Sequence, residues 1–357
     1  MTRAGSTQTA AVLVGHGGLE CLRVRHDVAV PSPGVGQVLV AVTAAAVNNT
    51  DLWTRQGAYG LAGDPGASAG WRGPISFPRI QGGDIAGRIA EVGHDVDPTR
   101  VGQRVVVDPA RYDGHGDGAT PVALLGSEAD GGFAEYVIVD AERAHAMDDS
   151  PLTDDQLACL PIAYGTAMGM LQRGRVRPGE TVLVTGASGG VGLALVQLAA
   201  ASGVQVVALT HESVREQVEV AGAARTVSRS AGDLRAQLSD AAPAGLDAVL
   251  DVVAGHVLET AFDALTEAGR WVIAGAIAGP VVTIDIRRLY LHQRQLIGSS
   301  MHTPAHFRQL VDAARQGRVA PMVAATYPLT EIHQAQRDFV GAGHVGKLVL
   351  HPAMVAE

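Results

Sequence analysis

The sequence predicts an α/β protein with two domains, a mainly β domain followed by a doubly wound parallel sheet. Residues 181–210 read as a strand, a glycine-rich turn, a helix and a second strand, which together make a βαβ unit. Strand and helix patterns continue to alternate up to about residue 300, as in a parallel sheet with helices on its faces. The first 150 residues instead hold many short apolar runs separated by Gly and Pro, which is typical of a barrel or sandwich.

Length and composition suit a globular protein with two cores. The chain has 357 residues, of which 47% are hydrophobic and 18% are charged. Its net charge of -9 argues against nucleic acid or an anionic membrane as the main partner. We see no signal peptide and no apolar run of about eighteen residues, and Cys21 and Cys159 are too few for a disulfide framework. These features predict a cytoplasmic protein.

In the first domain, apolar runs bounded by turn residues predict the strands. They lie at 11–14, 28–30, 37–42, within 78–107 and at 131–139. Asp51 is placed to cap a short helix after the third of these strands. Residues 60–76 form a loop of Gly, Pro and Ala without periodicity, and a loop of that length is usually either functional or disordered.

The second domain begins where the composition changes, at Ser150-Pro151. Thr153 can cap a helix that runs on towards residue 171. Further elements predicted there are the strands 182–184, 204–209, 246–253 and 269–275 and the helices 193–201 and 306–316. Helix 331–340 and strand 347–350 again have the pattern of the first domain. We therefore place the first domain at 1–151, the second at 152–319, and expect 320–357 to complete the first.

The turn at 185–192 is the basis of the functional prediction. Its glycines allow a sharp turn and a close approach of the backbone to a pyrophosphate. The free N–H groups and the positive dipole at the start of the next helix can then hold the phosphates. A glycine turn alone often has no ligand, but here both flanking strands and the helix are present, which favours dinucleotide binding. The residues expected to contact the cofactor are Gly186, Ala187, Ser188, Gly189, Gly190 and Val191.

A set of strings spread over nearly the whole chain carries a family resemblance. They are AAVNNTDLWTRQGAYG (45–60), GGDIAGRIAEVG (82–93), VGQRV (101–105), GGFAEYVIV (131–139), LPIAYGTAMGML (160–171), TGASGGVG (185–192) and GHVGKLVL (343–350). Together they resemble the medium-chain dehydrogenase/reductase superfamily, and most closely its zinc-independent quinone oxidoreductase branch of the zeta-crystallin type. The resemblance implies a GroES-like catalytic domain, a Rossmann cofactor domain, an active-site cleft between them and a homodimer.

The sequence departs from the zinc alcohol dehydrogenases of this superfamily at their metal ligands. Asn48, Gly83 and Ile162 stand where those enzymes carry a Cys, a His and a second Cys, and the four-cysteine lobe is absent. Zinc prefers Cys, His and carboxylate ligands, which these three residues cannot supply. The histidines weighed as an alternative lack the i,i+4 pairing of a helical metal site, and we interpret them as solvated or hydrogen-bonded: His115, His292, His302 and His306. We therefore predict no metal.

The end of the second strand of the βαβ unit favours NADPH over NADH. NAD is normally read there by an acidic side chain that accepts hydrogen bonds from the ribose, but this chain has Thr210, followed by His211. Arg215 and Arg229 lie shortly downstream, near the places where quinone oxidoreductases hold the 2′-phosphate with a lysine and a tyrosine, and Arg binds phosphate well. The alternatives are that both arginines are surface charges and that Glu212 contacts a ribose.

The resemblance also implies contacts at the nicotinamide end of the cofactor. Thr166 would lie against the nicotinamide, Gly275 and Ile277 would border its ribose, and Lys347 would lie near the pyrophosphate. Asn48 is a further candidate for contact with the cofactor. The alternative for Lys347 is a solvated charge at a strand end.

The absence of a metal restricts the chemistry that we expect. No Lewis acid would polarise an unactivated carbonyl, so hydride transfer needs an electron-poor acceptor such as a quinone or an α,β-unsaturated carbonyl. Donors around the substrate oxygen, each worth about 3 kcal/mol, can stabilise its developing charge. The resemblance implies Asn48 and Tyr59 as donors and Thr50 as a proton-relay hydroxyl. Alternatively, Asn48 is a structural turn residue and Tyr59 packs beside Trp53.

The sequence therefore predicts an NADPH-dependent, zinc-free reductase of quinones or α,β-unsaturated carbonyls. The alternatives are an enoyl-thioester reductase, a non-catalytic NADPH-binding protein and a zinc alcohol dehydrogenase. We expect the insertion around Trp71 to shape or cover the substrate mouth. Residues 281–286 and 295–299 are candidate edge strands that pair across a dimer.

Overall fold

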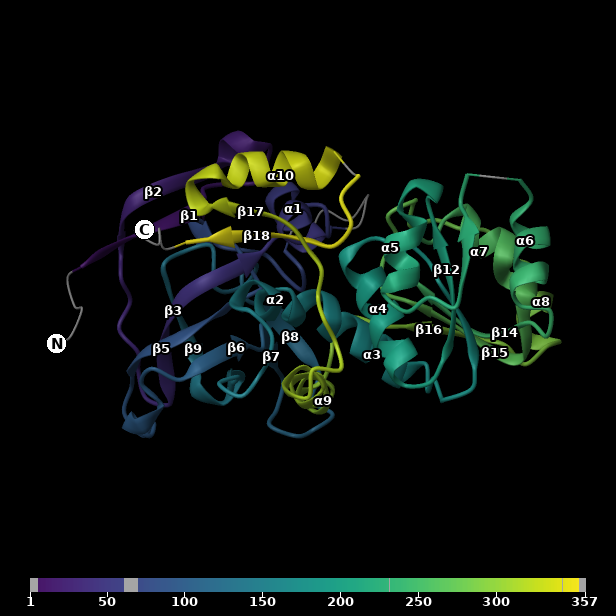
Figure 1. The fold of residues 1–357 in the computed structure, drawn as a ribbon. Helices are drawn as coiled ribbons and strands as arrows, with labels where there is room; N and C mark the ends of the chain where they lie inside the picture. The colour runs from purple at the N-terminus through teal and green to yellow at the C-terminus, as the bar shows by residue number, and fades with distance from the viewer. Residues whose placement is uncertain (1–5, 61–69, 231, 342, 353–357) are drawn as a thin grey trace. The chain divides into compact units, whose positions relative to one another are not determined.

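The computed structural model describes residues 6–60, 70–230, 232–341 and 343–352, and the chain divides into two compact units (Figure 1). Unit 1 comprises Met1–Ile162, Thr303–Gly317 and Pro321–Glu357, and unit 2 comprises Ala163–His302 and Arg318–Ala320. Unit 1 is mainly β and unit 2 is a parallel sheet with helices, which confirms the predicted fold class. Among the described residues, no helix is long and apolar enough to cross a lipid bilayer.

The strands of unit 1 form one large sheet and two small ones. They are β1 (Thr7–Leu13), β2 (Leu22–Ala29), β3 (Gln37–Ala46), β4 (Arg79–Ile80), β5 (Ala86–Val92), β6 (Arg104–Val107), β7 (Ala110–Tyr112), β8 (Pro121–Leu124), β9 (Tyr136–Asp140), β10 (Ala144–Ala146), β17 (Val323–Pro328) and β18 (Lys347–His351). The large sheet has the order β10-β6-β5-β3-β18-β17, and β9 also pairs with β3. Because β18 pairs antiparallel with β3, with Val349 opposite Ala46, the C-terminal segment lies inside this sheet.

Short helices connect the strands of unit 1. They are η1 (Leu19–Cys21), α1 (Asn49–Gln56), η2 (Pro98–Arg100), η3 (Ala141–Arg143), α2 (Asp154–Ala158), α9 (Pro304–Arg315), η7 (Leu329–Glu331) and α10 (Ile332–Gly341), and a π-helical turn, η4 (Leu160–Tyr164), leads into unit 2. The core of unit 1 contains Val40, Ile85, Phe133 and Leu348, all buried. The N-cap of α1 is Asn48, and Asp51, predicted as the cap, instead completes the capping box from the first turn, since its carboxylate accepts the Asn48 N–H at 2.8 Å.

The first unit runs on to Ile162, later than the predicted boundary at 151, and the chain returns to it at Thr303, earlier than the predicted boundary at 319. Helix α2, predicted in the second domain, belongs to unit 1. Helix α9 belongs there too, because Arg315 donates to the Ala146 carbonyl at 2.6 Å and the rings of Phe307 and His145 lie 5.1 Å apart. Contacts made far along the chain decide the unit to which these helices belong, and such contacts do not appear in the alternation of strands and helices.

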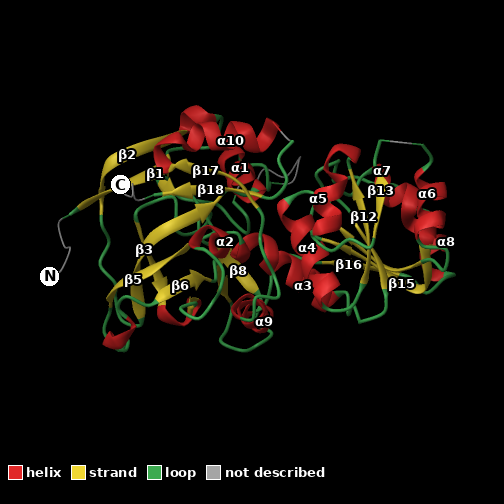
Figure 2. Cartoon of the chain, viewed as in Figure 1, coloured by secondary structure: helices red, strands yellow, loops and turns green. Residues whose placement is uncertain are grey.

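Unit 2 is a six-stranded parallel sheet with helices on both faces (Figure 2). Its strands are β11 (Thr181–Val184), β12 (Gln205–Thr210), β13 (Arg225–Ser228), β14 (Leu246–Asp251), β15 (Leu265–Ile273) and β16 (Gln295–Gly298). Its helices are α3 (Gly165–Arg173), α4 (Gly190–Ala201), η5 (Glu212–Val214), α5 (Arg215–Val220), α6 (Leu234–Ala241), α7 (His256–Ala261), η6 (Phe262–Ala264) and α8 (Arg287–Tyr290). The strand order is β13-β12-β11-β14-β15-β16, so the chain builds the sheet outwards in one direction from β11 and in the other direction from β14. Such sheets bind their ligands at the carboxyl ends of the strands where this order changes, here between β11 and β14.

One predicted strand of unit 2 is absent. Residues 281–286 pair with no strand among the described residues, although Val282 and Ile284 pack on the core around Trp271. The other candidate edge, 295–299, largely forms β16, which pairs with β15 on one side.

Candidate active site

The glycine turn of unit 2 joins β11 to α4 at the carboxyl edge of the sheet. Gly189 caps α4, and Gly186 has a φ of 57°, a left-handed conformation that favours glycine. A Cβ atom at Gly192 would lie 2.1 Å from the Gly186 carbonyl oxygen, so a larger residue does not fit. The turn thus points the free N–H groups of α4 at the place where the strand order reverses, which fits the pyrophosphate of a dinucleotide.

The carboxylate of Asp251, fully buried at the same edge, joins the two central strands. It accepts hydrogen bonds from the Thr185 hydroxyl at 2.6 Å and from Trp271 Nε1 at 2.8 Å. The backbone N–H groups of Val253 and Ala254 donate to it at 2.8 and 3.0 Å. The sequence reasoning missed Asp251, although a carboxylate that ends an apolar strand is a visible signal. Asp251 holds Thr185, the residue from which the glycine turn starts.

The end of β12 has an unsatisfied polar group that fits the adenosine ribose. The Thr210 hydroxyl is buried, and it has no hydrogen-bond partner within the part of the chain that the structure describes. The backbone of the exposed Arg229 lies beside Thr210, since the Arg229 N–H donates to the Thr210 carbonyl at 2.9 Å. Arg215 is instead engaged by Glu219 at 2.9 Å and by Glu212 at 3.4 Å. Arg229 is therefore the better placed of the two predicted phosphate ligands.

The other predicted cofactor residues of unit 2 lie at ends of strands or in α3. Gly275 follows β15 and has no room for a side chain, because a Cβ atom would lie 2.8 Å from a neighbouring carbonyl oxygen. His211 follows β12 at the same carboxyl edge, Ile277 is exposed, and Thr166 is buried in α3. These positions suit the expected contacts with a dinucleotide, which stay predictions.

In unit 1, Asn48, Asp84 and Lys347 form a buried, hydrogen-bonded cluster. The Lys347 ammonium lies 3.0 Å from Asp84 Oδ2 and donates to Asn48 Oδ1. Asn48 Nδ2 donates to Asp84 Oδ2 at 2.8 Å and to the Ala46 carbonyl at 3.2 Å. Both N–H groups of the Asn48 amide are thereby used. The predicted donation from Asn48 to a substrate oxygen would require one of these bonds to break.

The three positions at which the sequence lacks the zinc ligands of related alcohol dehydrogenases, Asn48, Gly83 and Ile162, lie in or against this cluster. Asp84 Oδ1 accepts the Ile162 N–H at 2.7 Å, and a Cβ atom at Gly83 would lie 3.0 Å from Ile162 Cδ1. The pyrophosphate contact predicted for Lys347 is untested, and it would require the ammonium to give up a partner in this cluster. The sequence reasoning did not single out Asp84, which directly follows Gly83.

Asp51 is a buried acid next to this cluster. The pKa of Asp51 is raised to about 7, mainly by burial and also by the nearby Asp84 carboxylate, which together outweigh the lowering by the Asn48 N–H and the Lys347 ammonium. Part of the Asp51 population is therefore protonated near neutral pH.

Thr50 and Tyr59 bring two hydroxyl groups together beside α1. They share a hydrogen bond, and the Tyr59 ring packs edge-on against Trp53 with the ring centroids 5.4 Å apart. Burial raises the pKa of Tyr59 to about 12, so its hydroxyl stays protonated and able to donate at neutral pH. The structure thus shows that Tyr59 packs beside Trp53, and its donation to a ligand stays a prediction.

The predicted loop at 60–76 falls partly outside the described residues, which omit 61–69. Its described end is tied to the turn after β8. The Trp71 N–H donates to Ser127 Oγ at 3.0 Å, and the Arg72 N–H donates to Glu128 Oε1 at 2.9 Å. The negative charge of Glu128 also contributes to the raised pKa of Tyr59, so this end of the loop lies near the hydroxyl pair.

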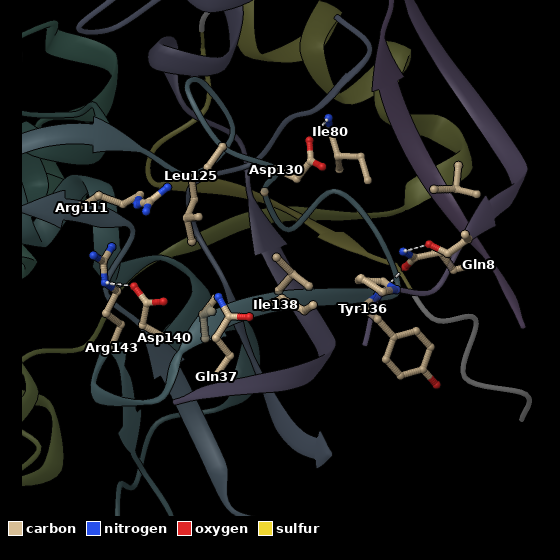
Figure 3. Close-up of a pocket in the computed structure, with 17 residues that line it drawn as sticks. Gln8, Gln37, Ile80, Arg111, Leu125, Asp130, Tyr136, Ile138, Asp140 and Arg143 are labelled. Atoms are coloured by element: carbon tan, nitrogen blue, oxygen red, sulfur yellow. Dashed lines mark hydrogen bonds and ion pairs between the residues drawn. The ribbon is translucent and has the colours of Figure 1, made fainter. Parts of the chain in front are cut away.

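Unit 1 also contains a cavity of about 360 Å³ that none of the predicted site residues lines (Figure 3). Three of its charged side chains already have partners, since Arg143 lies 3.3 Å from Asp140 and Asp130 accepts from Arg79, outside the lining, at 2.7 Å. We therefore do not place the active site there.

Comparison with known proteins agrees with this arrangement. The family described as "Alcohol dehydrogenase GroES-like domain" matches residues 34–149, and the family described as "Zinc-binding dehydrogenase" matches residues 190–316. The quinone oxidoreductase of Mus musculus is 30% identical over 347 residues, covering 94% of this chain and 95% of that protein. The chain belongs to the medium-chain dehydrogenase/reductase superfamily, in its quinone oxidoreductase branch.

Solved structures of the superfamily are similar over nearly all of the chain. A putative alcohol dehydrogenase from Sinorhizobium meliloti 1021 has a TM-score of 0.93 and 45% identity, covering 97% of each chain. A cobalt- and zinc-bound thermostable alcohol dehydrogenase from Pyrobaculum aerophilum has a TM-score of 0.82 and 31% identity, covering 97% of this chain and all of that one. The protein is thus an oxidoreductase of this superfamily, whose members include both quinone oxidoreductases and metal-bound alcohol dehydrogenases.

The residues of this chain do not fit a zinc ion at the cluster in unit 1. Asp84 bonds directly to Lys347 and Asn48, the neighbouring Asp51 carboxylate already accepts the Asn48 N–H, and Asn48, Gly83 and Ile162 offer no thiolate, imidazole or carboxylate. The Lys347 ammonium adds a positive charge 3.0 Å from Asp84. Elsewhere within the described ranges, no three His, Cys, Asp or Glu side chains gather as a metal site would require.

Proposed function

We propose that the protein is an NADPH-dependent, zinc-free reductase of quinones or α,β-unsaturated carbonyls. The observation that carries this proposal is the pair of hydroxyls of Thr50 and Tyr59 near a cluster in which Asn48, at a metal-ligand position, and Asp84 bond to the Lys347 ammonium. The similarity to quinone oxidoreductases over 94% of the chain supports the same substrate class.

In this proposal, residues of unit 2 bind the cofactor and residues of unit 1 bind the substrate oxygen. NADPH, when bound, supplies a hydride from C4 of its nicotinamide. In unit 2, the turn from Gly186 to Gly192 binds the pyrophosphate through backbone N–H groups, and Thr210 and Arg229 bind the ribose and its 2′-phosphate. In unit 1, Tyr59 donates a hydrogen bond to the substrate oxygen on which charge develops, and the Thr50 hydroxyl relays a proton to that oxygen.

The reaction requires an electron-poor acceptor because neutral hydrogen-bond donors polarise a carbonyl less than a metal ion does. Hydroxyl groups stabilise a developing oxyanion, but they do not polarise a saturated ketone as strongly as zinc does. A quinone or an enone already draws electrons from the carbon that receives the hydride, so such donors suffice.

We further propose that the protein is a cytoplasmic homodimer. Strand β16 is an edge of the six-stranded sheet, and large apolar side chains are exposed in it and in the segment that precedes it along the chain. These side chains are Val281, Ile286, Tyr290, Leu291 and Leu296. A second copy that continues the sheet at β16 would pair the edge and cover them. The free thiols of Cys21 and Cys159 support a reducing compartment.

Consumption of NADPH by the purified protein tests the proposed activity. The acceptors are a benzoquinone, a naphthoquinone, an acyclic enone, an enoyl thioester and a saturated ketone, and NADP⁺ with an alcohol tests the reverse reaction. We expect turnover with the quinones or the enone and no effect of a metal chelator. Activity with the alcohol alone, lost with the chelator, would identify a zinc alcohol dehydrogenase; NADPH binding without any turnover would identify a non-catalytic binding protein.

A further inference from the structure

Lys347 is the only lysine in a chain that has 27 Lys and Arg residues. It begins β18 and its side chain is buried in unit 1 with about 5% of its surface exposed. Every other basic position is occupied by Arg, so a compact ammonium in this place is an exception within the sequence. Arg and Lys differ in shape, because Arg presents a planar fork of donors and Lys presents a point charge with three N–H groups.

The surroundings of Lys347 offer one oxygen acceptor for each of the three N–H groups of its ammonium. Its Nζ donates to the Val47 carbonyl at 2.9 Å and to Asn48 Oδ1, and it lies 3.0 Å from Asp84 Oδ2. The three acceptors come from the end of β3, the start of α1 and the segment before β5. One backbone oxygen, one amide oxygen and one carboxylate oxygen thus surround the cation much as oxygen ligands surround a hard metal ion.

We propose that the ammonium of Lys347 is an internal cation that replaces a metal ion in this domain and positions Asn48 and Asp84. The proposal rests on the zinc-free function proposed above. It names Lys347 as the residue whose positive charge takes the place of a metal ion in unit 1. A buried carboxylate without a cation is costly, and Lys347 neutralises Asp84 without a ligand from solution. Asn48 caps α1, so the cluster also fixes the helix that carries Thr50.

A double-mutant cycle tests the pairing of Lys347 with Asp84. Lys347→Met keeps the length of the side chain and removes its charge, and Asp84→Asn removes the opposite charge. We expect each single variant to lower the urea midpoint of unfolding, and the double variant to recover most of the loss caused by Lys347→Met. Losses that simply add would overturn the proposal. This measurement needs no turnover, so it stands even if no quinone or enone is reduced.

NADPH affinity separates the internal cation from a cofactor ligand. With Lys347→Met, we expect the dissociation constant of NADPH to stay within about twofold, because the ammonium already has three partners. If Lys347 instead contacts the pyrophosphate, the affinity falls at least about tenfold and the salt dependence of binding weakens. That outcome, with an unchanged urea midpoint, would overturn the proposal.

The lone lysine gives a direct spectroscopic readout. Protein labelled with ¹⁵N at lysine Nζ has a single side-chain signal, which needs no assignment. We expect Asp84→Asn to move this signal and Asp240→Asn, at an exposed position in α6, to leave it in place. A signal unaffected by Asp84→Asn, or stoichiometric zinc bound to Asp84 in crystals of the wild-type protein grown with zinc, would contradict the proposal.

Discussion

The Thr185 hydroxyl donates a hydrogen bond to the buried Asp251 carboxylate at 2.6 Å, from the end of one central strand of unit 2 to the end of its neighbour. The same carboxylate accepts from Trp271 Nε1 at 2.8 Å. Because Gly186 follows Thr185 directly, this bond fixes the position from which the phosphate-binding turn begins. A residue that touches no ligand in our proposal therefore decides whether the turn is preformed.

We predict that Thr185→Val weakens NADPH binding as well as the fold. A hydrogen bond to a charged group contributes about 1.5–3 kcal/mol, and the variant leaves the Asp251 carboxylate short of one donor. We expect a lower unfolding midpoint in urea and a dissociation constant for NADPH raised about tenfold. Thr181→Val, at the opposite end of β11, serves as the control. Equal NADPH affinity in the two variants would show that the bond does not shape the turn.

Asp51 makes the stability of the protein depend on pH. Its pKa in the folded protein is about 7, above the value of 3.8 for an exposed aspartate, so the folded state binds more protons between these values. Stability therefore falls as pH rises from about 4 to 7, by up to about 4 kcal/mol from this group. We predict that Asp51→Asn reduces this fall, measured as the difference between urea midpoints at pH 5 and pH 8. Asp240→Asn, an exposed aspartate, is expected to behave as the wild type does.

Removal of the Tyr59 hydroxyl tests its role as a donor. Tyr59→Phe keeps the ring that packs against Trp53, so we expect little change in stability. The loss of one donor to a developing oxyanion is expected to lower kcat by about 10²-fold, with a smaller effect on KM. Because the pKa of Tyr59 is about 12, the wild-type kcat should show no decline from tyrosine ionisation up to about pH 10. An unchanged kcat in Tyr59→Phe would limit Tyr59 to packing.

Thr50→Val removes the hydroxyl that shares a hydrogen bond with Tyr59. If Thr50 relays the proton, the variant loses kcat, and the effect is not additive with that of Tyr59→Phe. We expect the double variant to be about as slow as the slower single variant. Fully additive losses, measured in the same quinone assay, would mean that the two hydroxyls act independently.

The selectivity for NADPH is expected to depend on Arg229 more than on Arg215. Arg229 is exposed beside Thr210, whereas Arg215 is already held by Glu219 and Glu212. Arg229→Ala should weaken NADPH binding about ten- to hundredfold and leave NADH binding nearly unchanged, since charge-assisted bonds to phosphate contribute about 1.5–3 kcal/mol. Arg215→Ala is the matched comparison. A preference for NADH in the wild-type protein would contradict the cofactor proposal itself.

The exposed edge of unit 2 predicts where a dimer can be broken. Leu291→Glu places a charge among the apolar side chains near β16 and should convert a dimer into monomers in sedimentation experiments. Val122→Glu introduces the same charge at an exposed apolar residue of β8 in unit 1, and it should leave the dimer intact. A wild-type protein that sediments as a monomer at micromolar concentration would rule out this interface.

Features encoded by neighbouring residues were predictable from the sequence. The βαβ unit at 181–210, the contribution of Asp51 to the capping box of α1 and the cap of α2 by Thr153 all appear in the structure. Each depends on residues a few positions apart, whose spacing fixes which groups can bond. The strand expected at 281–286 was wrong, because the segment packs on the core through Val282 and Ile284 but finds no neighbouring strand to pair with within the described residues.

The sequence by itself determined the fold class, the glycine turn and the absence of zinc-type side chains at Asn48, Gly83 and Ile162. Only the tertiary structure decided how those positions are filled, since Lys347 reaches Asn48 from 299 residues further along the chain. It also decided that both N–H groups of Asn48 are used and that the pKa of Asp51 is raised. The physical reason is that burial and charge pairing depend on which distant segments meet, and a buried charge takes its character from those neighbours.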